Sequence, residues 1–284
     1  MAAVAVCLVF GWLTLQRAPE GRVRVGLAVT DATVASFETE DRDEAMAVVR
    51  AYASRVEALA AQGAEIVVLP EKFVSVHAAW AQETRATLAL AARNARVTLV
   101  AGLNERPPAG PLRNLAVVFS PEGEILAEYS KQHLLPGPES GYERGSRDTR
   151  IGRLGVAICK DMDFPDLGRR QSRAGAGLLL VPAWDFVKDA RLHGHMAILR
   201  GIEGGYAIAR TAQEGLMTVT DAHGRIVAER ASFDRPEVLL VADVGLGPGR
   251  TIYSRMGDAF GWVAVALGTV LLLAAGLRGR RPDQ

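Results

Sequence analysis

Apolar and polar positions alternate with two different periods along residues 22–244. Short runs that are apolar throughout or at every second position predict strands, whereas apolar spacings of three and four predict helices. Strands are expected at 23–29, 66–69, 97–103, 115–119, 125–129, 154–158, 178–181, 206–210, 217–221, 226–229 and 238–244. Helices are expected at 41–61, 77–94 and 192–203, with a short one beginning near residue 164. Because no repeat or linker interrupts this alternation, we expect one α/β domain over residues 22–250.

Both ends of the chain differ from this middle part. Residues 259–277 carry no charge and are almost wholly apolar, which predicts a transmembrane helix with Trp262 as an interfacial anchor; a buried core helix is the alternative. The basic tail at 278–284 is expected in the cytoplasm. Residues 1–16 are also apolar and predict a short membrane segment. The middle domain is therefore expected on the periplasmic, outer side of a bacterial-type cytoplasmic membrane.

Composition excludes several classes of function. Lys and Arg (33) nearly balance Asp and Glu (32), so no basic footprint for nucleic acid is expected. The two cysteines, Cys7 and Cys159, are too few for a disulfide framework or a CxxC metal site. The five histidines lack metal-binding spacing, so no metal or other cofactor is expected.

Three predicted strands are followed by residues that can carry chemistry. Glu71, Lys131 and Cys159 each follow such a strand directly or within a short turn. A thiol needs a base to become a thiolate, and a nearby cation stabilises an oxyanion, so the three suffice for covalent acyl transfer. Spacing alone leaves the alternative open that Cys159 is a small buried hydrophobe and that Glu71 and Lys131 are ordinary turn residues.

The segments VVLPEKF, YSKQHLLPGPE and GVAICKDMDFPDL, in this order, resemble the nitrilase, or carbon–nitrogen hydrolase, superfamily. The resemblance implies an α-β-β-α sandwich with a Glu-Lys-Cys triad. It implies that Glu71 is the general base, that Lys131 stabilises the oxyanion and that Cys159 is the nucleophile. Glu139 matches a second glutamate that orients the lysine and the substrate, and the backbone N–H of Lys160 would complete the oxyanion hole.

Within this superfamily the chain resembles the apolipoprotein N-acyltransferases, on HLLP after Lys131 and on TIYSRMGDAFGWV near the C-terminus. That resemblance implies a phospholipid acyl donor and a lipoprotein amine as acceptor. Trp184 matches a tryptophan at the border of the acyl-chain pocket, although an ordinary core aromatic is an equal alternative. Where that family usually has a tyrosine and a glutamate, this chain has Lys160 and Asp161. We expect Asp161 to keep the acidic role and Lys160 to favour the thiolate.

The expected function is N-acyl transfer through a thioester on Cys159. The first alternative is hydrolysis of a small amide, because the acyltransferases carry a membrane bundle before the domain and this chain has only residues 1–15 there. The second alternative is a catalytically silent, membrane-tethered binding domain, for which Glu71, Lys131 and Cys159 would have no physical need.

Overall fold

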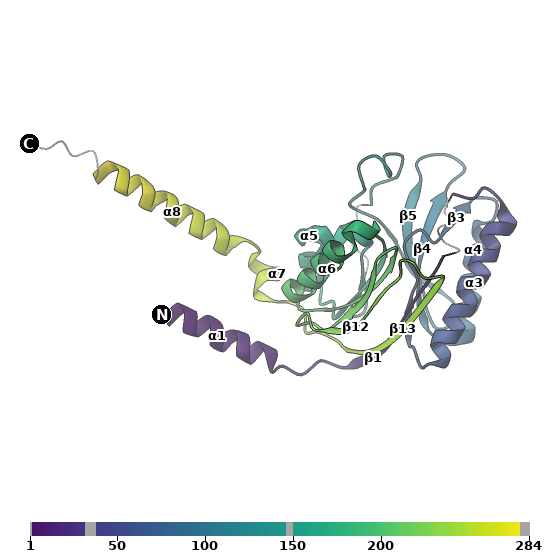
Figure 1. The fold of residues 1–284 in the computed structure, drawn as a ribbon, viewed down its shortest axis with the longest axis horizontal. Coiled ribbons are helices and arrows are strands. Elements are labelled where there is room, and N and C mark those ends of the chain that lie inside the picture. The colour runs from purple at the N-terminus through teal and green to yellow at the C-terminus, as the bar shows by residue number, and fades with distance from the viewer. Residues whose placement is uncertain (1, 32–37, 146–149, 279–284) are drawn as a thin grey trace, which may run out of the picture.

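The computed structural model describes residues 2–31, 38–145 and 150–278. Within them, two mixed β-sheets of seven and six strands pack face to face (Figure 1). Two helices lie on the outer face of each sheet, so the α-β-β-α sandwich expected from the sequence is confirmed.

The first sheet has the strand order β13-β1-β2-β4-β5-β6, with β3 paired to β4. Its strands are β1 (Arg22–Thr30), β2 (Ile66–Val68), β3 (Val74–His77), β4 (Thr98–Arg106), β5 (Arg113–Phe119), β6 (Ile125–Ser130) and β13 (Glu237–Gly245). The second sheet has the order β12-β11-β10-β9-β8-β7. Its strands are β7 (Arg150–Ile151), β8 (Leu154–Val156), β9 (Leu178–Trp184), β10 (Ala207–Gln213), β11 (Leu216–Thr220) and β12 (Ile226–Ala231).

Two apolar layers hold the sandwich together. The first fills the space between the sheets, where Leu27 and Val68 of one sheet belong to the same buried cluster as Leu180 and Ile208 of the other. The second lies between the first sheet and the helices α3 (Arg42–Ala61) and α4 (Ala81–Ala95). The helices α5 (Pro165–Arg173) and α6 (Ala190–Gly204) cover the second sheet. Strands buried on both faces are continuously apolar, which explains why the sequence pattern located most of them.

One expected helix begins later than the sequence indicates. Residues 77–94 were expected to be helical, but α4 begins at Ala81 and the preceding residues form β3. The chain makes a turn at Lys72, whose φ is 48°, and then continues in the direction of β2, so that Val74 pairs in parallel with Leu103 of β4. This pairing joins residues that are distant in sequence, so the spacing of apolar residues along the chain could not reveal it.

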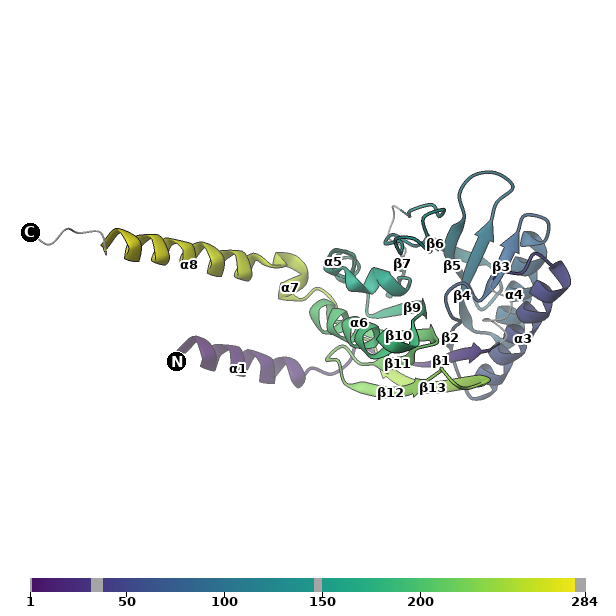
Figure 2. The same cartoon turned by 45° about the horizontal axis from the view of Figure 1, so that its top comes forward.

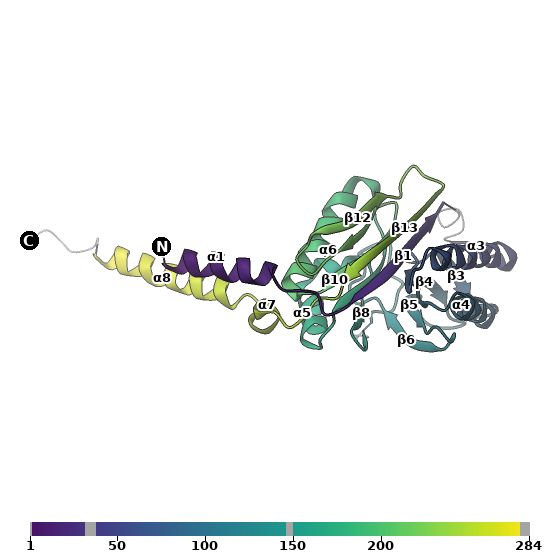
Figure 3. The same cartoon turned by 90° about the horizontal axis from the view of Figure 1, so that it is seen from below.

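Two further helices project from the same end of the sandwich (Figures 2 and 3). They are α1 (Ala2–Leu15) and α8 (Ala259–Arg278), which follows the short α7 (Ile252–Met256). Their apolar side chains are exposed; Trp262, for example, is 72% exposed. In the described part of the chain, no helix combines the length and the apolar character needed to cross a membrane, so the two expected membrane spans are not supported. For α1 the reason is its 14 residues, about 21 Å against about 30 Å of hydrocarbon. Most of the predicted basic tail (279–284) lies outside the described residues.

Candidate active site

The three candidate catalytic residues lie along one seam between the two sheets. Glu71 follows β2, and Lys131 directly follows β6 of the same sheet. Cys159 follows β8 of the second sheet and begins the 3-10 helix η1 (Cys159–Asp163). β1, β2 and β4 are parallel in the first sheet, as are β8, β9 and β10 in the second. The carboxyl ends of parallel strands are where α/β proteins commonly place their binding sites.

A buried ammonium group connects two carboxylates at this seam. Lys131 Nζ lies 2.8 Å from Glu71 Oε1 and 2.9 Å from Glu139 Oε2, and none of the three side chains is more than 2% exposed. Asn114 Nδ2 donates to both carboxylates, at 2.6 Å to Glu71 Oε1 and 2.8 Å to Glu139 Oε1. The carboxylates therefore share one cation and one amide in a dry environment, where such contacts are strong.

The charges in this cluster stabilise one another. Burial alone lowers the pKa of Lys131, but Glu71, Cys159 and Glu139 together raise that pKa above its ordinary value. Burial works to raise the pKa of Glu139, yet Lys131 and Lys72 outweigh it and lower that pKa to about 2. At neutral pH the site therefore holds a charged lysine and an ionised Glu139.

Cys159 sits at the start of a strained turn. Its φ is 42°, a left-handed conformation that is uncommon outside glycine and is often found at functional positions. The Sγ atom donates to the carbonyl oxygen of Trp184 at 3.3 Å, and the N–H of Trp184 donates to Glu71 Oε2 at 3.0 Å. Burial and the Glu71 carboxylate raise the pKa of the thiol, and Lys131 only partly offsets them. In the resting site the sulfur is therefore a protonated thiol that requires a base.

Asp161 joins the turn that carries Cys159 to the segment that carries Lys131. Its Oδ2 accepts from the Tyr129 hydroxyl at 2.6 Å and from the N–H of Ile158 at 3.0 Å. Its Oδ1 accepts from the N–H groups of Gln132 at 3.1 Å and His133 at 2.8 Å. The carboxylate is fully buried, so these bonds determine the position of η1 relative to β6.

We expect Asp161→Asn to lower both stability and turnover. An asparagine offers one acceptor oxygen in place of two, which leaves buried N–H or O–H donors without a partner at a cost of about 1–3 kcal/mol. Denaturant unfolding measures this loss, and the turnover rate and KM measure the displacement of Cys159. Asp166→Asn, an exposed change a few residues further on, is the control. If turnover in Asp161→Asn is unchanged while stability falls, Asp161 has a purely structural role.

The structure gives Lys160 and Trp184 different surroundings from those expected. Lys160 Nζ lies 3.4 Å from Asp163 Oδ2, and the cations with the largest effect in lowering the pKa of the Cys159 thiol are Lys131 and Arg210. That Lys160 favours the thiolate stays a prediction. The indole of Trp184 donates to Glu214 Oε2 at 2.9 Å, and both backbone polar groups of Trp184 bond within the seam. Its role beside an acyl chain stays a prediction.

Four residues of this region escaped the sequence interpretation. Asn114 joins the site from β5, and Lys72 reaches Glu139 Oε1 at 3.1 Å. Arg210 and Asp185 form a buried pair with Nη2–Oδ1 at 2.5 Å, and their charges also act on the Cys159 thiol. Of these four, only Lys72 could have been singled out from the sequence, because it follows Glu71 directly.

In the described residues, no group of three His, Cys, Asp or Glu side chains could hold a metal ion.

Comparison with known protein families shows which family the chain resembles as a whole. The carbon-nitrogen hydrolase family matches residues 28–248. The chain belongs to this family. The chain is 30% identical to an apolipoprotein N-acyltransferase of Geobacter metallireducens over 189 residues, 57% of this chain and 36% of that protein. It is 28% identical to the Gloeobacter violaceus apolipoprotein N-acyltransferase, over 99% of this chain and 59% of the relative. The chain thus spans only part of the length of both acyltransferases.

Amidases of the carbon-nitrogen hydrolase family are similar to a comparable degree. A deaminated glutathione amidase of Synechocystis is 31% identical over 67% of this chain and 79% of the amidase. An amidase from Nesterenkonia sp. AN1, with the acetamide moiety of fluoroacetamide added covalently at its active site cysteine, superposes with a TM-score of 0.68. That superposition covers 81% of this chain and 93% of the amidase at 23% identity, which shows a shared fold.

Proposed function

We propose that this carbon-nitrogen hydrolase is an N-acyltransferase that carries its acyl group as a thioester on Cys159. The observation that supports this most is the Lys131 ammonium group, held by Glu71 and Glu139 at the seam where the Cys159 thiol lies. A base, a cation and a thiol in one buried site are what covalent acyl transfer requires.

In the proposed first half-reaction, Glu71 takes the thiol proton as Sγ attacks an ester carbonyl carbon. The C–S bond forms, and the carbonyl electrons move to an oxyanion that Lys131 and the backbone N–H of Lys160 stabilise. When the oxyanion collapses, the C–O bond of the ester breaks and the leaving alkoxide takes the proton from Glu71. In the second half, an amine attacks the thioester, Glu71 accepts its proton, and the breaking C–S bond returns a thiolate that recovers this proton.

Exposed apolar side chains near the seam support a lipid substrate. Phe164 follows η1, Phe186 and Val187 follow β9, and Leu192 lies in the first turn of α6. All four are at least 37% exposed. An acyl chain laid across them would gain about 25 cal/mol for each Å² of apolar surface removed from water. The exposed apolar surfaces of α1 and α8 support a location at a membrane surface. The periplasmic side is proposed from the sequence alone.

Hydrolysis of small amides is the second candidate. Its specific support is the Synechocystis glutathione amidase, of which the match covers 79%. In this reaction water replaces the amine in the second half, and ammonia or an amine leaves in the first.

We expect full-length protein in neutral detergent to transfer a labelled acyl chain from phosphatidylethanolamine to a diacylated lipopeptide with a free α-amine. Cys159→Ala should form no product, because no thioester can form. Cys7→Ala is the matched control, since it removes the other cysteine, which is exposed on α1. Mass spectrometry of the lipopeptide measures the transfer, and an ammonia assay with small amides runs in parallel.

Ammonia release with no triacylated lipopeptide would contradict acyl transfer and support the amidase. If neither product forms and Cys159 forms no covalent adduct with an activated ester, the proposed chemistry is wrong.

Fractionation of cells that make the full chain tests the proposed membrane location. Recovery of the protein in the soluble fraction would contradict that location.

A further inference from the structure

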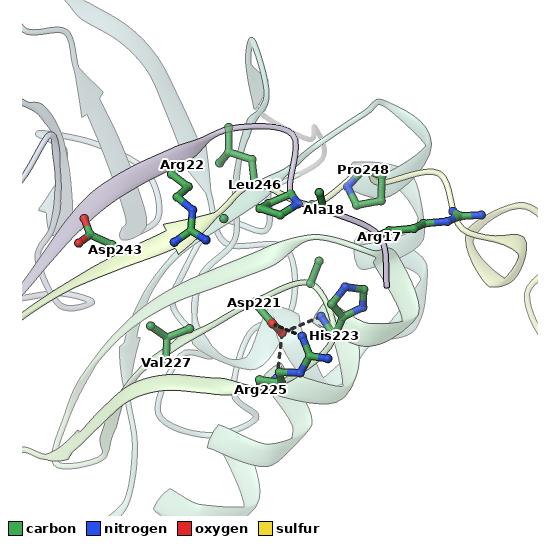
Figure 4. Close-up of a pocket in the computed structure, with 14 residues that line it drawn as sticks. Arg17, Ala18, Arg22, Asp221, His223, Arg225, Val227, Asp243, Leu246 and Pro248 are labelled. Carbon is green, nitrogen blue, oxygen red and sulfur yellow. Dashed lines mark hydrogen bonds and ion pairs between the residues drawn. The ribbon is translucent and has the colours of Figure 1, made fainter. Parts of the chain in front are cut away.

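A cavity of about 300 Å³ lies between the start of β1 and the turn that joins β11 to β12 (Figure 4). It is at the opposite end of the sandwich from Cys159. We call it the basal pocket. The polar residues that line it include Arg22, Asp221, His223, Arg225 and Asp243. Its position follows from the strand register. Thr220, next to the pocket, pairs with Ile208 near the start of β10, whereas Trp184 pairs with Gln213 at the end of β10. The seven residues of β10 separate the two ends by about 20 Å.

Cationic groups dominate this pocket once the existing ion pairs are considered. The Asp243 carboxylate is held by Arg24, at 2.8 and 2.7 Å. The Asp221 Oδ1 atom accepts from the backbone N–H groups of His223 at 2.8 Å and Arg225 at 2.9 Å, and Asp221 Oδ2 lies 3.4 Å from Nη1 of Arg225. Arg22 has no hydrogen bond from its guanidinium group within the described chain. Both carboxylates are therefore satisfied, while Arg22 retains its donors.

The guanidinium donors of Arg22 point into the basal pocket. Arg22, at the start of β1, extends its guanidinium group toward the turn between β11 and β12, where His223 and Arg225 lie (Figure 4). The guanidinium group of an arginine can donate two parallel hydrogen bonds to the oxygens of a phosphate group, and a histidine ring can add a further donor. Val227 and Pro248 form an apolar part of the wall of the same pocket. A ligand with an anionic and an apolar part fits both kinds of wall.

The pocket also lies where both apolar helices leave the domain. Arg17 is two residues beyond the end of α1, and Pro248 lies on the segment that leads from β13 to α7 and α8. The two helices extend from this end of the sandwich (Figures 1 and 2). A lipid bound along those helices would bring its headgroup to the level of the basal pocket.

We propose that the basal pocket binds a phosphate ester, with the anionic oxygens held by Arg22, Arg225 and His223. A lipid headgroup and a soluble phosphate ester share this chemistry, and the experiment separates them. The site is independent of the thioester chemistry, because none of its residues belongs to the seam that contains Cys159.

Two binding measurements on the full-length protein test this proposal. Calorimetric titration with glycerol 3-phosphate, in neutral detergent, measures binding of a soluble phosphate ester. Flotation with vesicles of a neutral galactolipid, with and without phosphatidylglycerol, measures the additional binding that a lipid phosphate provides. We expect Arg22→Gln and Arg225→Gln each to weaken the binding by about tenfold, the loss of one charge-assisted phosphate contact.

Arg235→Gln is the matched control, because it makes the same charge change on the exposed loop at the other end of the β12–β13 hairpin. Binding of glycerol 3-phosphate that depends on Arg22 supports the site with a soluble ligand. Phosphatidylglycerol-dependent flotation that depends on Arg22, without glycerol 3-phosphate binding, supports a lipid headgroup. Absence of both, or an equal loss in Arg235→Gln, overturns the proposal. Since Arg22 and Arg225 are exposed, thermal unfolding should show that both variants fold.

Discussion

Glu71→Gln should slow acylation of Cys159 by about 10²–10⁴-fold, the usual contribution of a positioned general base. The thiol is protonated in the resting site because burial and the Glu71 carboxylate raise its pKa. A glutamine of nearly the same size can still accept hydrogen bonds from Asn114 and Lys131, but it cannot accept the thiol proton. The rate of thioester formation from an activated ester, followed by mass spectrometry of the intact protein, measures the effect.

The pH dependence of the same variant provides a second readout. Without the carboxylate, reaction depends on the small fraction of free thiolate, which rises about tenfold per pH unit while the pH stays below the pKa of the thiol. The Glu71→Gln rate should therefore climb more steeply with pH than the wild-type rate, so that the difference between the two rates narrows. Glu124→Gln, an exposed change in the loop before β6, is the control. An acylation rate of Glu71→Gln within twofold of the wild type at neutral pH would contradict the proposed base.

Lys131→Met should lower both stability and catalysis. The variant leaves Glu71 and Glu139 buried without the ammonium group that both contact, and removal of one partner from a buried ion pair costs about 3–5 kcal/mol. Loss of oxyanion stabilisation should in addition reduce turnover by about 10²–10³-fold. Urea unfolding measures the first effect and steady-state kinetics the second.

A second substitution separates these two effects. In Lys131→Met combined with Glu139→Gln, one uncompensated carboxylate is gone, so part of the stability should return while turnover stays low.

The dependence of stability on pH provides a further test of Lys131→Met. In the wild type the pKa of Glu139 is lowered to about 2, so its stabilising contribution is present above its ordinary pKa and is lost as the pH falls toward 2. Without Lys131 this carboxylate protonates at higher pH, so the stability difference between wild type and variant should narrow on acidification. A difference that widens would contradict this account.

Much of the fold could be predicted because its determinants are local. A helix was expected from residue 41, and the Asp41 carboxylate accepts from the N–H groups of Asp43 and Glu44 at the start of α3. The buried strands were visible as apolar runs because parallel strands are covered on both faces. β3 was missed because its four residues form a strand only by pairing with β4 after the turn at Lys72.

The candidate site divides in the same way. Glu71, Lys131 and Cys159 could be singled out because each follows an apolar strand and lies in a motif of the superfamily. Asn114 had no such signal, since it enters the site only because β5 pairs between β4 and β6. Likewise, the four donors to Asp161 come from neighbouring and distant segments that meet only in the folded chain.

By itself, the sequence determined the sandwich, the family and the three residues with suitable chemistry, because periodicity and motifs are properties of the chain as written. Only the tertiary structure decided which charges meet. It paired Lys160 with Asp163, surrounded Lys131 with two carboxylates, and brought the start of β1 beside the β11–β12 turn to form the basal pocket. Such contacts depend on distances between residues far apart along the chain, and these distances exist only once the two sheets have packed together.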